Sequence, residues 1–517
     1  MYTSPCAVLL NSAGVWRGHI CSGHKAGCSC YRSAAAVRFP GLGFPGFPAP
    51  EFVSTYYMLR RNDKDMSPIR LYIFATIYCF ATIKVVLTGS VVVTTRLPTV
   101  TTSSGDVFGS LLPRNKDDDL QSEVAQYLGI PFAKPTKRWE PPQDFFAQPY
   151  VSDPLNATMW GRACLQVLSE TSTYGSEDCL SANVWTPAID GNEDGNESLL
   201  PVLVFIYGGS DQFGEAEPYN MSALAAYHQV VAVNFNYRTG PIGWMSFQED
   251  VEANRSTGNF GILDIQSALR WVQREIVHFG GDKSRVAIHG QSSGGGLVEL
   301  QYVSPQSNNL FQAAISESGG LHAESLASAL DVSREAAKLT GCANASSPKT
   351  CMQALPGLNI TSLTYQLGWG PVVDGVTIPY DPMEMLEDGA INPSSVVFGA
   401  QTNDSFLFLS EDYTKDGLPQ PNSYPDGHLR AISKTEYEIA LSKSVPSALV
   451  SAALTLYPPS ADARSIVNVH MLGAVESDDM HCALRRRAAH FDRAQPDKNT
   501  SFVYRFDYYY KSSPTCK

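Results

Sequence analysis

A five-residue motif constrains this chain most strongly: positions 290–294 read GQSSG and match the pattern G-x-S-x-G. The segment 285–289 (RVAIH) before it predicts a short strand, and the residues after it predict a helix. Such a sharp turn exposes the serine at the edge of a sheet, and the N-terminus of the following helix favours negative charge there. Glycines at 290 and 294 let neighbouring backbone approach. The context predicts that Ser292 is a nucleophile, against the alternative of a Ser/Gly-rich loop without chemistry.

The region after residue 100 alternates predicted strands and helices, which is typical of a mostly parallel sheet flanked by helices. The apolar runs 202–207 and 230–235 are short and dense enough for strands buried on both faces. Between 262 and 276, isoleucine, leucine and valine recur at spacings of three and four residues, which predicts an amphipathic helix. The fold class is therefore predicted to be α/β.

Composition excludes some classes of function. The net charge of −13 over 517 residues argues against a nucleic-acid partner, because phosphate binding needs a basic face. Cys28 and Cys30 lie near His19 and His24, but their C-x-C spacing departs from that of zinc sites. We expect no metal and no cofactor.

The N-terminal part does not resemble a domain. We interpret residues 1–65 as a disordered or spurious extension, with translation starting at Met66. The apolar segment 71–93 follows basic residues and is interrupted by Lys84, as in a signal peptide. The alternative is a type II signal anchor, which would attach the protein to a membrane through 71–93. Residues 66–97 are thus a signal peptide or an anchor, and the protein is secreted, lumenal or membrane-anchored.

Cysteines and glycosylation motifs indicate an oxidising compartment. Six of the eleven cysteines follow residue 80, and an even number permits disulfides. All eight N-x-S/T motifs follow residue 100. Both features favour the secretory pathway.

Several longer motifs, in the same order, resemble those of type-B carboxylesterases, the family that includes cholinesterases and related fungal lipases. The segments that carry the resemblance are 127–135 (YLGIPFAKP), 176–180 (SEDCL), 236–244 (NYRTGPIGW), 258–295 and 314–320 (AISESGG). The resemblance implies an α/β-hydrolase domain over residues 98–517, with a central mostly parallel sheet flanked by helices and incomplete at its C-terminus. It also implies a small-molecule or lipid ester as substrate.

The resemblance extends to the groups that stabilise an oxyanion. The segment 206–214 (IYGGSDQFG) is similar to the oxyanion loop of the family, so the N–H groups of Gly209, Ser210 and Ser293 are expected to face the oxyanion. The family usually has glycine where this chain has Ser210. If that position requires positive φ, serine strains the loop. Gln291 also replaces the usual glutamate before the nucleophile.

The acid of the catalytic triad is expected to be Asp404. The segment 395–408 resembles the family's G-x-x-x-D-E-G-x-x-F motif, with Asp404 at the glutamate position. An aspartate can orient a histidine and stabilise the imidazolium. A solvated loop aspartate is the alternative, because Ser405 replaces a glycine.

No convincing catalytic histidine follows Asp404. The candidates are His428, His470, His481 and His490. In the family this histidine lies in a loop beyond the strand that resembles 502–508, so we expect that the chain is truncated before it. A serine without its base is a poor nucleophile, and loss of the histidine costs on the order of 10⁶ in kcat. The chain as given is therefore expected to be inactive.

The resemblance implies disulfides Cys164–Cys179 and Cys342–Cys351, which leaves Cys482 and Cys516 as a third pair. The predicted function is hydrolysis of carboxylic esters through an acyl-enzyme on Ser292. Two alternatives stay open: a non-catalytic, esterase-like surface or adhesion protein, and an inactive truncated gene product.

Overall fold

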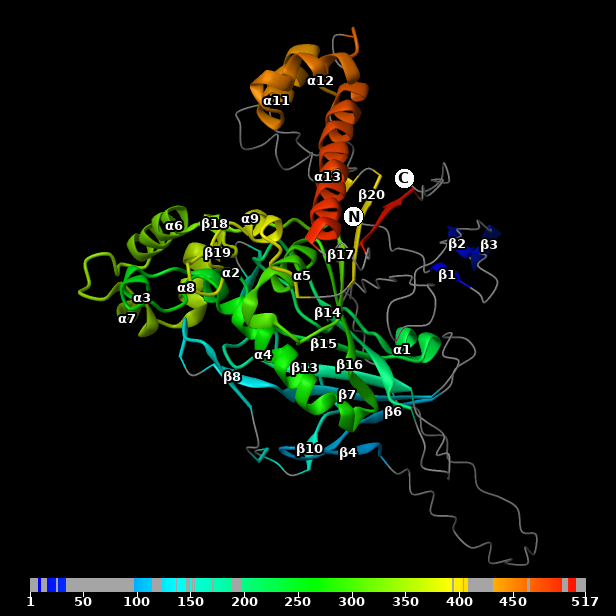
Figure 1. Ribbon diagram of the computed structural model, residues 1–517, viewed down its shortest axis with the longest axis vertical. Helices are drawn as coiled ribbons and strands as arrows, with labels where there is room; N and C mark the ends of the chain where they lie inside the picture. The colour runs from blue at the N-terminus through cyan, green and yellow to red at the C-terminus, as the bar shows by residue number, and fades with distance from the viewer. Residues whose placement is uncertain are drawn as a thin grey trace, which may run out of the picture.

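The computed structural model describes most of the chain from residue 97 onward (Figure 1). The described ranges are 97–113, 123–135, 137–145, 149–150, 152, 154–169, 172–187, 198–392, 395–402, 404–407, 431–462, 465–494 and 501–507, with the backbone of 8–10, 16–24 and 27–33. These three early segments are strands β1 (Val8–Leu10), β2 (Trp16–His24) and β3 (Gly27–Ser33), paired in an antiparallel sheet of their own. The interpretation of residues 1–65 stays a prediction.

A nine-stranded sheet forms the centre of the molecule. In spatial order its strands are β21 (Ser501–Phe506), β20 (Ser395–Gln401), β17 (Ala313–Glu317), β16 (Gly281–Gln291), β14 (Leu200–Ile206), β15 (Val231–Phe235), β13 (Ser181–Pro187), β7 (Val124–Pro131) and β6 (Ser110–Leu112). The pairs from β21 to β15 are parallel, and those from β15 to β6 are antiparallel. The predicted mostly parallel sheet is confirmed.

The strand predictions agree with the burial. Every residue of β15 is buried, as are all residues of β14 after Leu200. Such strands contact other elements on both faces, which explains their continuous apolar sequence. β16 begins at Gly281, earlier than the expected strand 285–289. Its first residues pair with β14 across an irregularity, so they lack the apolar pattern of the later part.

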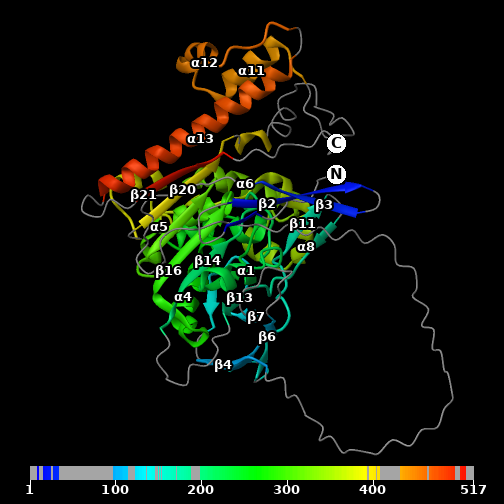
Figure 2. The same cartoon turned by 90° about the vertical axis from the view of Figure 1, so that its right-hand side faces the viewer.

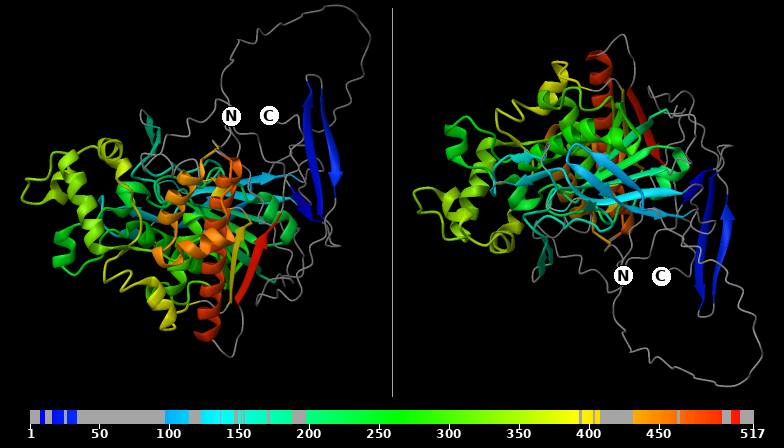
Figure 3. Two further views of the ribbon diagram at one scale, coloured as in Figure 1. Left: turned by 90° about the horizontal axis from the view of Figure 1, so that it is seen from above. Right: turned by 90° about the horizontal axis from the view of Figure 1, so that it is seen from below.

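Helices cover this sheet. The predicted amphipathic helix is α4 (Phe260–Glu275), and its apolar stripe is buried. The other helices are α1 (Ser222–His228), α2 (Gly240–Trp244), α3 (Gln248–Glu252), α5 (Ser293–Val303), α6 (Leu326–Leu339), α7 (Pro348–Gln353), α8 (Gly357–Thr364), α9 (Pro382–Glu387), α11 (Lys434–Ser444), α12 (Val450–Leu456) and α13 (Ile466–Ala494). Seen from above and below, α6–α8 lie on the side of the molecule away from β21 (Figure 3).

The late helices form a projection. α13 extends from the sheet and carries α11 and α12 at its far end (Figure 2). A small core of their own, separate from the main core, includes Tyr437, Leu441, Val469 and Leu472. Among the described residues no helix is long and apolar enough to cross a membrane. The segment 71–93 lies outside them.

Short strands complete the fold. They are β4 (Thr99–Thr102), β5 (Gly105–Phe108), β8 (Ala133–Pro135), β9 (Pro142–Asp144), β10 (Leu155–Asn156), β11 (Gln166–Ser169), β12 (Ser172–Tyr174), β18 (Glu324–Ser325) and β19 (Val372–Val373). Two disulfides stabilise the loops between elements. They are Cys164–Cys179, with Cα atoms 5.0 Å apart, and Cys342–Cys351, with 5.7 Å. Cys482 is an exposed free cysteine, and Cys516 lies outside the described residues, so the third pairing stays a prediction.

Candidate active site

Ser292 occupies a tight turn between β16 and α5. Its φ of 59° and ψ of −133° lie where a side chain is rarely tolerated. The turn is held from both sides, because the Ser292 N–H donates to the Glu317 carbonyl at 2.8 Å and Gly296 N–H donates to the Ser292 carbonyl at 3.1 Å. This is the strand–serine–helix geometry that the GQSSG motif predicts.

The two glycines of the motif are required by close backbone contacts. A Cβ on Gly290 would stand 2.3 Å from the carbonyl oxygen of Gly294. A Cβ on Gly294 would stand 2.3 Å from the carbonyl oxygen of Ile206, at the end of β14. The turn can therefore pack against β14 only if both residues lack side chains.

The loop after β14 lies against this turn. A Cβ on Gly208 would meet the Ser292 Cβ at 3.0 Å. The loop then passes through three residues with positive φ, namely Gly209 (128°), Ser210 (54°) and Asp211 (61°). Ser210 thus has a positive φ, the condition under which we expect the serine side chain to strain the loop. The loop also joins the turn through the Asp211 N–H, which donates to Ser293 Oγ at 3.1 Å.

The three predicted oxyanion donors lie on these two adjoining loops. Among the described residues, the N–H groups of Gly209, Ser210 and Ser293 donate to no protein acceptor. Free N–H groups beside a nucleophile are what an oxyanion hole requires. Their role stays a prediction.

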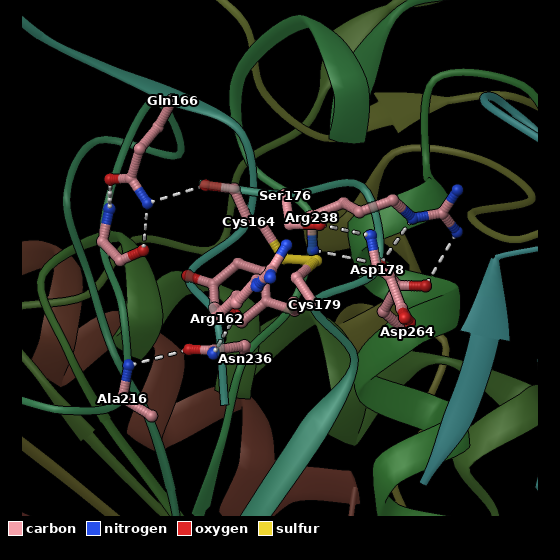
Figure 4. Close-up of a disulfide and its surroundings, with 12 residues drawn as sticks. Arg162, Cys164, Gln166, Ser176, Asp178, Cys179, Ala216, Asn236, Arg238 and Asp264 are labelled. Carbon is pink, nitrogen blue, oxygen red and sulfur yellow. Dashed lines mark hydrogen bonds and ion pairs between the residues drawn. A yellow bond between two sulfur atoms is a disulfide. The ribbon is translucent and has the colours of Figure 1, made fainter. Parts of the chain in front are cut away.

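The Cys164–Cys179 disulfide holds the far end of the oxyanion loop (Figure 4). Gln166 Nε2 donates to the carbonyls of Cys164 at 3.0 Å and Gly214 at 2.9 Å. The Gly214 N–H donates back to Gln166 Oε1 at 2.8 Å. Two residues further on, the Ala216 N–H donates to Asn236 Oδ1 at 2.9 Å (Figure 4). The loop is therefore fixed at both ends.

A cavity of about 550 Å³ opens in front of Ser292. Its walls combine serines, two tryptophans and aliphatic side chains. The lining residues include Asp211, Gln212, Trp244, Ser292, Ser293, Leu297, Ser318, His322, Glu324, Val332, Trp369, Gly370 and Val372. Its size suits a small-molecule ligand.

Asp404 lies at the edge of this region. It begins the short 3₁₀ helix Asp404–Leu407 just after β20, and it is half-buried. Its Oδ2 accepts hydrogen bonds from the Ser318 hydroxyl and from the Gln401 N–H, the latter at 3.2 Å. Ser318 also lines the cavity of Ser292. The structure thus connects Asp404 to the cavity through Ser318, although its role as the triad acid stays a prediction.

The histidines after Asp404 that the structure describes do not line the cavity. His470, His481 and His490 all lie on α13. His481 is buried, with Nε2 3.0 Å from the Gln401 carbonyl, and His490 Nε2 lies 3.4 Å from Glu387 Oε1. His428 lies outside the described residues.

The sequence motifs do not predict two of the cavity residues. His322 precedes the acid in the chain, whereas the triad order places the histidine after it; His322 is exposed, with Nε2 3.4 Å from Glu324 Oε1. Asp211 is predicted from the sequence only to be part of the oxyanion loop. Burial raises the pKa of Asp211 to about 7, although the contact with Ser293 lowers it. The available signal is the single charged residue in the otherwise uncharged loop 208–214.

Comparison with known proteins gives the family. The model of the carboxylesterase family matches residues 96–516. Human cocaine esterase is 37% identical over 328 residues, which cover 59% of this chain and 56% of that protein. Human bile salt-activated lipase is 34% identical over 61% of this chain and 43% of its own. Human neuroligin-2 is 30% identical over 62% and 43%.

The chain spans about half the length of the curated relatives it matches. The family match does not support the expected C-terminal truncation, so the place of the catalytic histidine stays a prediction. Fold, motif order and family match agree, and the chain belongs to the carboxylesterase family.

Proposed function

We propose that this protein hydrolyses carboxylic esters with Ser292 as the nucleophile. The observation that carries the proposal is the strained turn at Ser292, which lies beside three N–H groups without acceptors among the described residues. Strained backbone of this kind persists where the surrounding structure enforces it, as at active sites. Here the carbonyl of Glu317 and the loop after β14 enforce it.

The reaction would run in two steps. Ser292 Oγ attacks the carbonyl carbon, and the alcohol leaves to form an acyl-enzyme; water then releases the acid. The N–H groups of Gly209, Ser210 and Ser293 would stabilise the oxyanion in both steps. A neutral ester substrate develops negative charge only in the transition state, so donors placed in advance lower the barrier.

Asp404 would orient the histidine that takes the proton from Ser292. The described residues donate two hydrogen bonds to its carboxylate, and both go to Oδ2. This supports the proposal that Oδ1 accepts the hydrogen bond from the imidazole. In this fold the histidine follows the acid in the chain.

The substrate would be a small-molecule or lipid ester. Supporting this, the cavity combines apolar walls, including Leu297, Trp369 and Val372, with a few polar groups near Ser292. An apolar wall suits an acyl or alcohol chain.

A non-catalytic interaction protein is the second candidate. One support is the similarity to neuroligin-2. The other is that, of the described histidines, only His322 lines the cavity, and it is paired with Glu324. The two candidates differ in whether Ser292 reacts.

We also propose that the protein enters the secretory pathway, through a signal peptide or an anchor at 71–93. Two observations support this. The described residues include two disulfides, and disulfides persist in oxidising compartments. The acceptor asparagines of five glycosylation motifs are exposed, namely Asn156, Asn220, Asn254, Asn344 and Asn359.

Fluorophosphonate labelling of the purified protein tests the enzyme, with p-nitrophenyl ester turnover as the second readout. We expect labelling and turnover, and loss of both in Ser292→Ala. Ser442→Ala, on the exposed face of α11, is the matched control and should behave as the wild type. Labelling that survives Ser292→Ala would show that another residue is the nucleophile. No labelling of folded wild-type protein would favour the interaction protein.

A further inference from the structure

We propose that the cavity in front of Ser292 binds ligands that carry a primary ammonium group, with the Asp211 carboxylate as counter-ion. This inference deepens the proposed function and rests on it in one respect. If the protein is an esterase, its ester substrates would carry an amine near the bond that breaks. Binding itself requires only the cavity.

The main chain of Asp211 is held tightly, so its carboxyl has a defined place. Its N–H donates to Ser293 Oγ at 3.1 Å. Its carbonyl accepts from the Gly240 N–H at 2.7 Å and from Trp244 Nε1 at 2.9 Å. The carboxyl therefore stays in the cavity wall next to the turn of Ser292.

One oxygen of the carboxyl lacks a donor among the described residues, although Ser293 is hydrogen-bonded to the carboxyl group. Asp211 Oδ1 is buried and has no hydrogen-bond partner among the described residues. The same holds for Oε1 of the neighbouring Gln212, which also lines the cavity. The Gln212 amide is fixed by its nitrogen, which donates to the carbonyls of Ser210 and Trp369. Buried acceptors without donors are unusual in folded proteins, and two adjacent ones in a cavity wall indicate that a ligand supplies the donors.

No lysine or arginine among the described lining residues serves these acceptors. The residues that line the cavity include two carboxylates, Asp211 and Glu324, and none of these described residues is a lysine or arginine. His322 is the one lining residue able to become cationic, and it faces Glu324 at the exposed end. Burial raises the pKa of Asp211 to about 7, because the hydrogen bond with Ser293 offsets only part of the lost solvation of the ionised form. A bound cation would reverse this effect.

The chemistry of the acceptors selects the kind of cation. An ammonium of a primary amine carries a full charge and three N–H donors, enough for both oxygens. A quaternary ammonium has the charge but no donor, and an alcohol has one donor without charge. Trp244, Leu297 and Trp369 provide apolar surface for the rest of such a ligand.

The experiment compares three probes of similar shape on the full chain by calorimetry at pH 8. They are phenylpropylamine, trimethyl(phenylpropyl)ammonium and phenylpropanol. We expect the primary amine to bind about tenfold more tightly than either of the others, and its affinity to fall as the pH drops below the pKa of Asp211, about 7, while that of the alcohol stays constant.

Asp211→Asn keeps the shape but removes the charge, and it should abolish the preference for the amine. Glu324→Gln, at the exposed end of the cavity, is the matched control and should retain the preference. Gly370→Ala provides a second variant that leaves the charge in place. Its methyl would stand 3.6 Å from Asp211 Oδ2, where the ammonium is expected. Gly370→Ala should therefore weaken amine binding about as much as Asp211→Asn does.

Equal affinities for the amine and the alcohol in the wild type would overturn the proposal, as would an amine preference that survives in Asp211→Asn. Loss of the preference in Glu324→Gln alone would assign the counter-ion to Glu324 instead. Ser292→Ala should leave the preference intact. A protein that is not labelled by fluorophosphonate but still prefers the amine would refute the hydrolase and keep the ammonium site, so the two failures are distinguishable.

Discussion

Arg487 Nε lies 2.8 Å from Glu299 Oε2, and both side chains are buried. The pair joins α13 to α5, the helix that starts at the turn of Ser292. Ser316 Oγ donates to Glu299 Oε1 at 2.7 Å, and Arg487 Nη2 donates to the Gly319 carbonyl at 3.1 Å. The late helix thus supports the helix that follows the turn of Ser292, through a buried network.

Removing the arginine should be costly. In Arg487→Leu, Glu299 would be left buried without its cation, and breaking a buried pair in this way costs about 3–5 kcal/mol. We expect the midpoint of urea unfolding to fall accordingly. Arg334→Leu breaks an exposed pair with Asp331 and should change stability by less than about 1 kcal/mol. Similar midpoints for both variants would show that the network does not stabilise the fold.

The stability of the ligand-free protein should depend on Asp211 in a pH window that follows from its pKa. Burial raises this pKa from 3.8 to about 7, so the unfolded chain ionises first. The contribution of the neutral carboxyl to the free energy of unfolding is fully present below pH 3.8. It is lost as the pH rises to about 7, and it is absent above that pH. Asp211→Asn should therefore match the wild type in Tm near pH 4 and exceed it at pH 8. A constant difference in Tm across this range would contradict the raised pKa.

Ser210→Gly should stabilise the oxyanion loop. The φ of 54° costs a side chain about 1 kcal/mol relative to glycine, and the N–H group is unchanged. We expect a higher Tm and preserved fluorophosphonate labelling. Gly209→Ala is the informative contrast: its φ is 128°, and its Cβ would stand 2.1 Å from the Phe213 carbonyl oxygen, so it should be strongly destabilised. Loss of labelling in Ser210→Gly would show that the serine hydroxyl has a role.

Replacing Cys164 and Cys179 by serine should lower the free energy of unfolding by about 3 kcal/mol, because the disulfide closes a loop of 15 residues. Since the same loop holds Gly214 through Gln166, fluorophosphonate labelling should slow as well. Unchanged labelling at lower stability would mean that the oxyanion loop does not depend on the disulfide.

Peptide mapping without reduction checks the predicted Cys482–Cys516 bond in the same protein.

Glycopeptide mass spectrometry tests the secretory assignment. Asn156 and Asn254 are exposed, and we expect both to carry glycans. Asn403 is expected to stay unmodified, because the adjacent Asp404 is half-buried and bound to Ser318. A fully occupied Asn403 would indicate that Asp404 is a surface residue and that the acid lies elsewhere.

Local features of the site could be predicted because they depend on residues that are contiguous in the sequence. The turn at Ser292 needs a strand, glycines at 290 and 294, and a helix, and all lie within one short segment. Helix α4 could be predicted from its apolar spacing for the same reason. The place of Asp404 followed from a resemblance of motifs, and the structure adds the contact with Ser318 that connects it to the cavity.

The sequence by itself thus determined the fold class, the turn at Ser292 and the family, since these depend on local pattern and motif order. Tertiary structure alone decided the pKa of Asp211, which depends on burial of its carboxyl and on the contact with Ser293. It also decided the pairing of Glu299 with Arg487 and the presence of His322 in the cavity. The physical reason is that burial and partners set the energy of a charge, and both come from segments far apart in the chain.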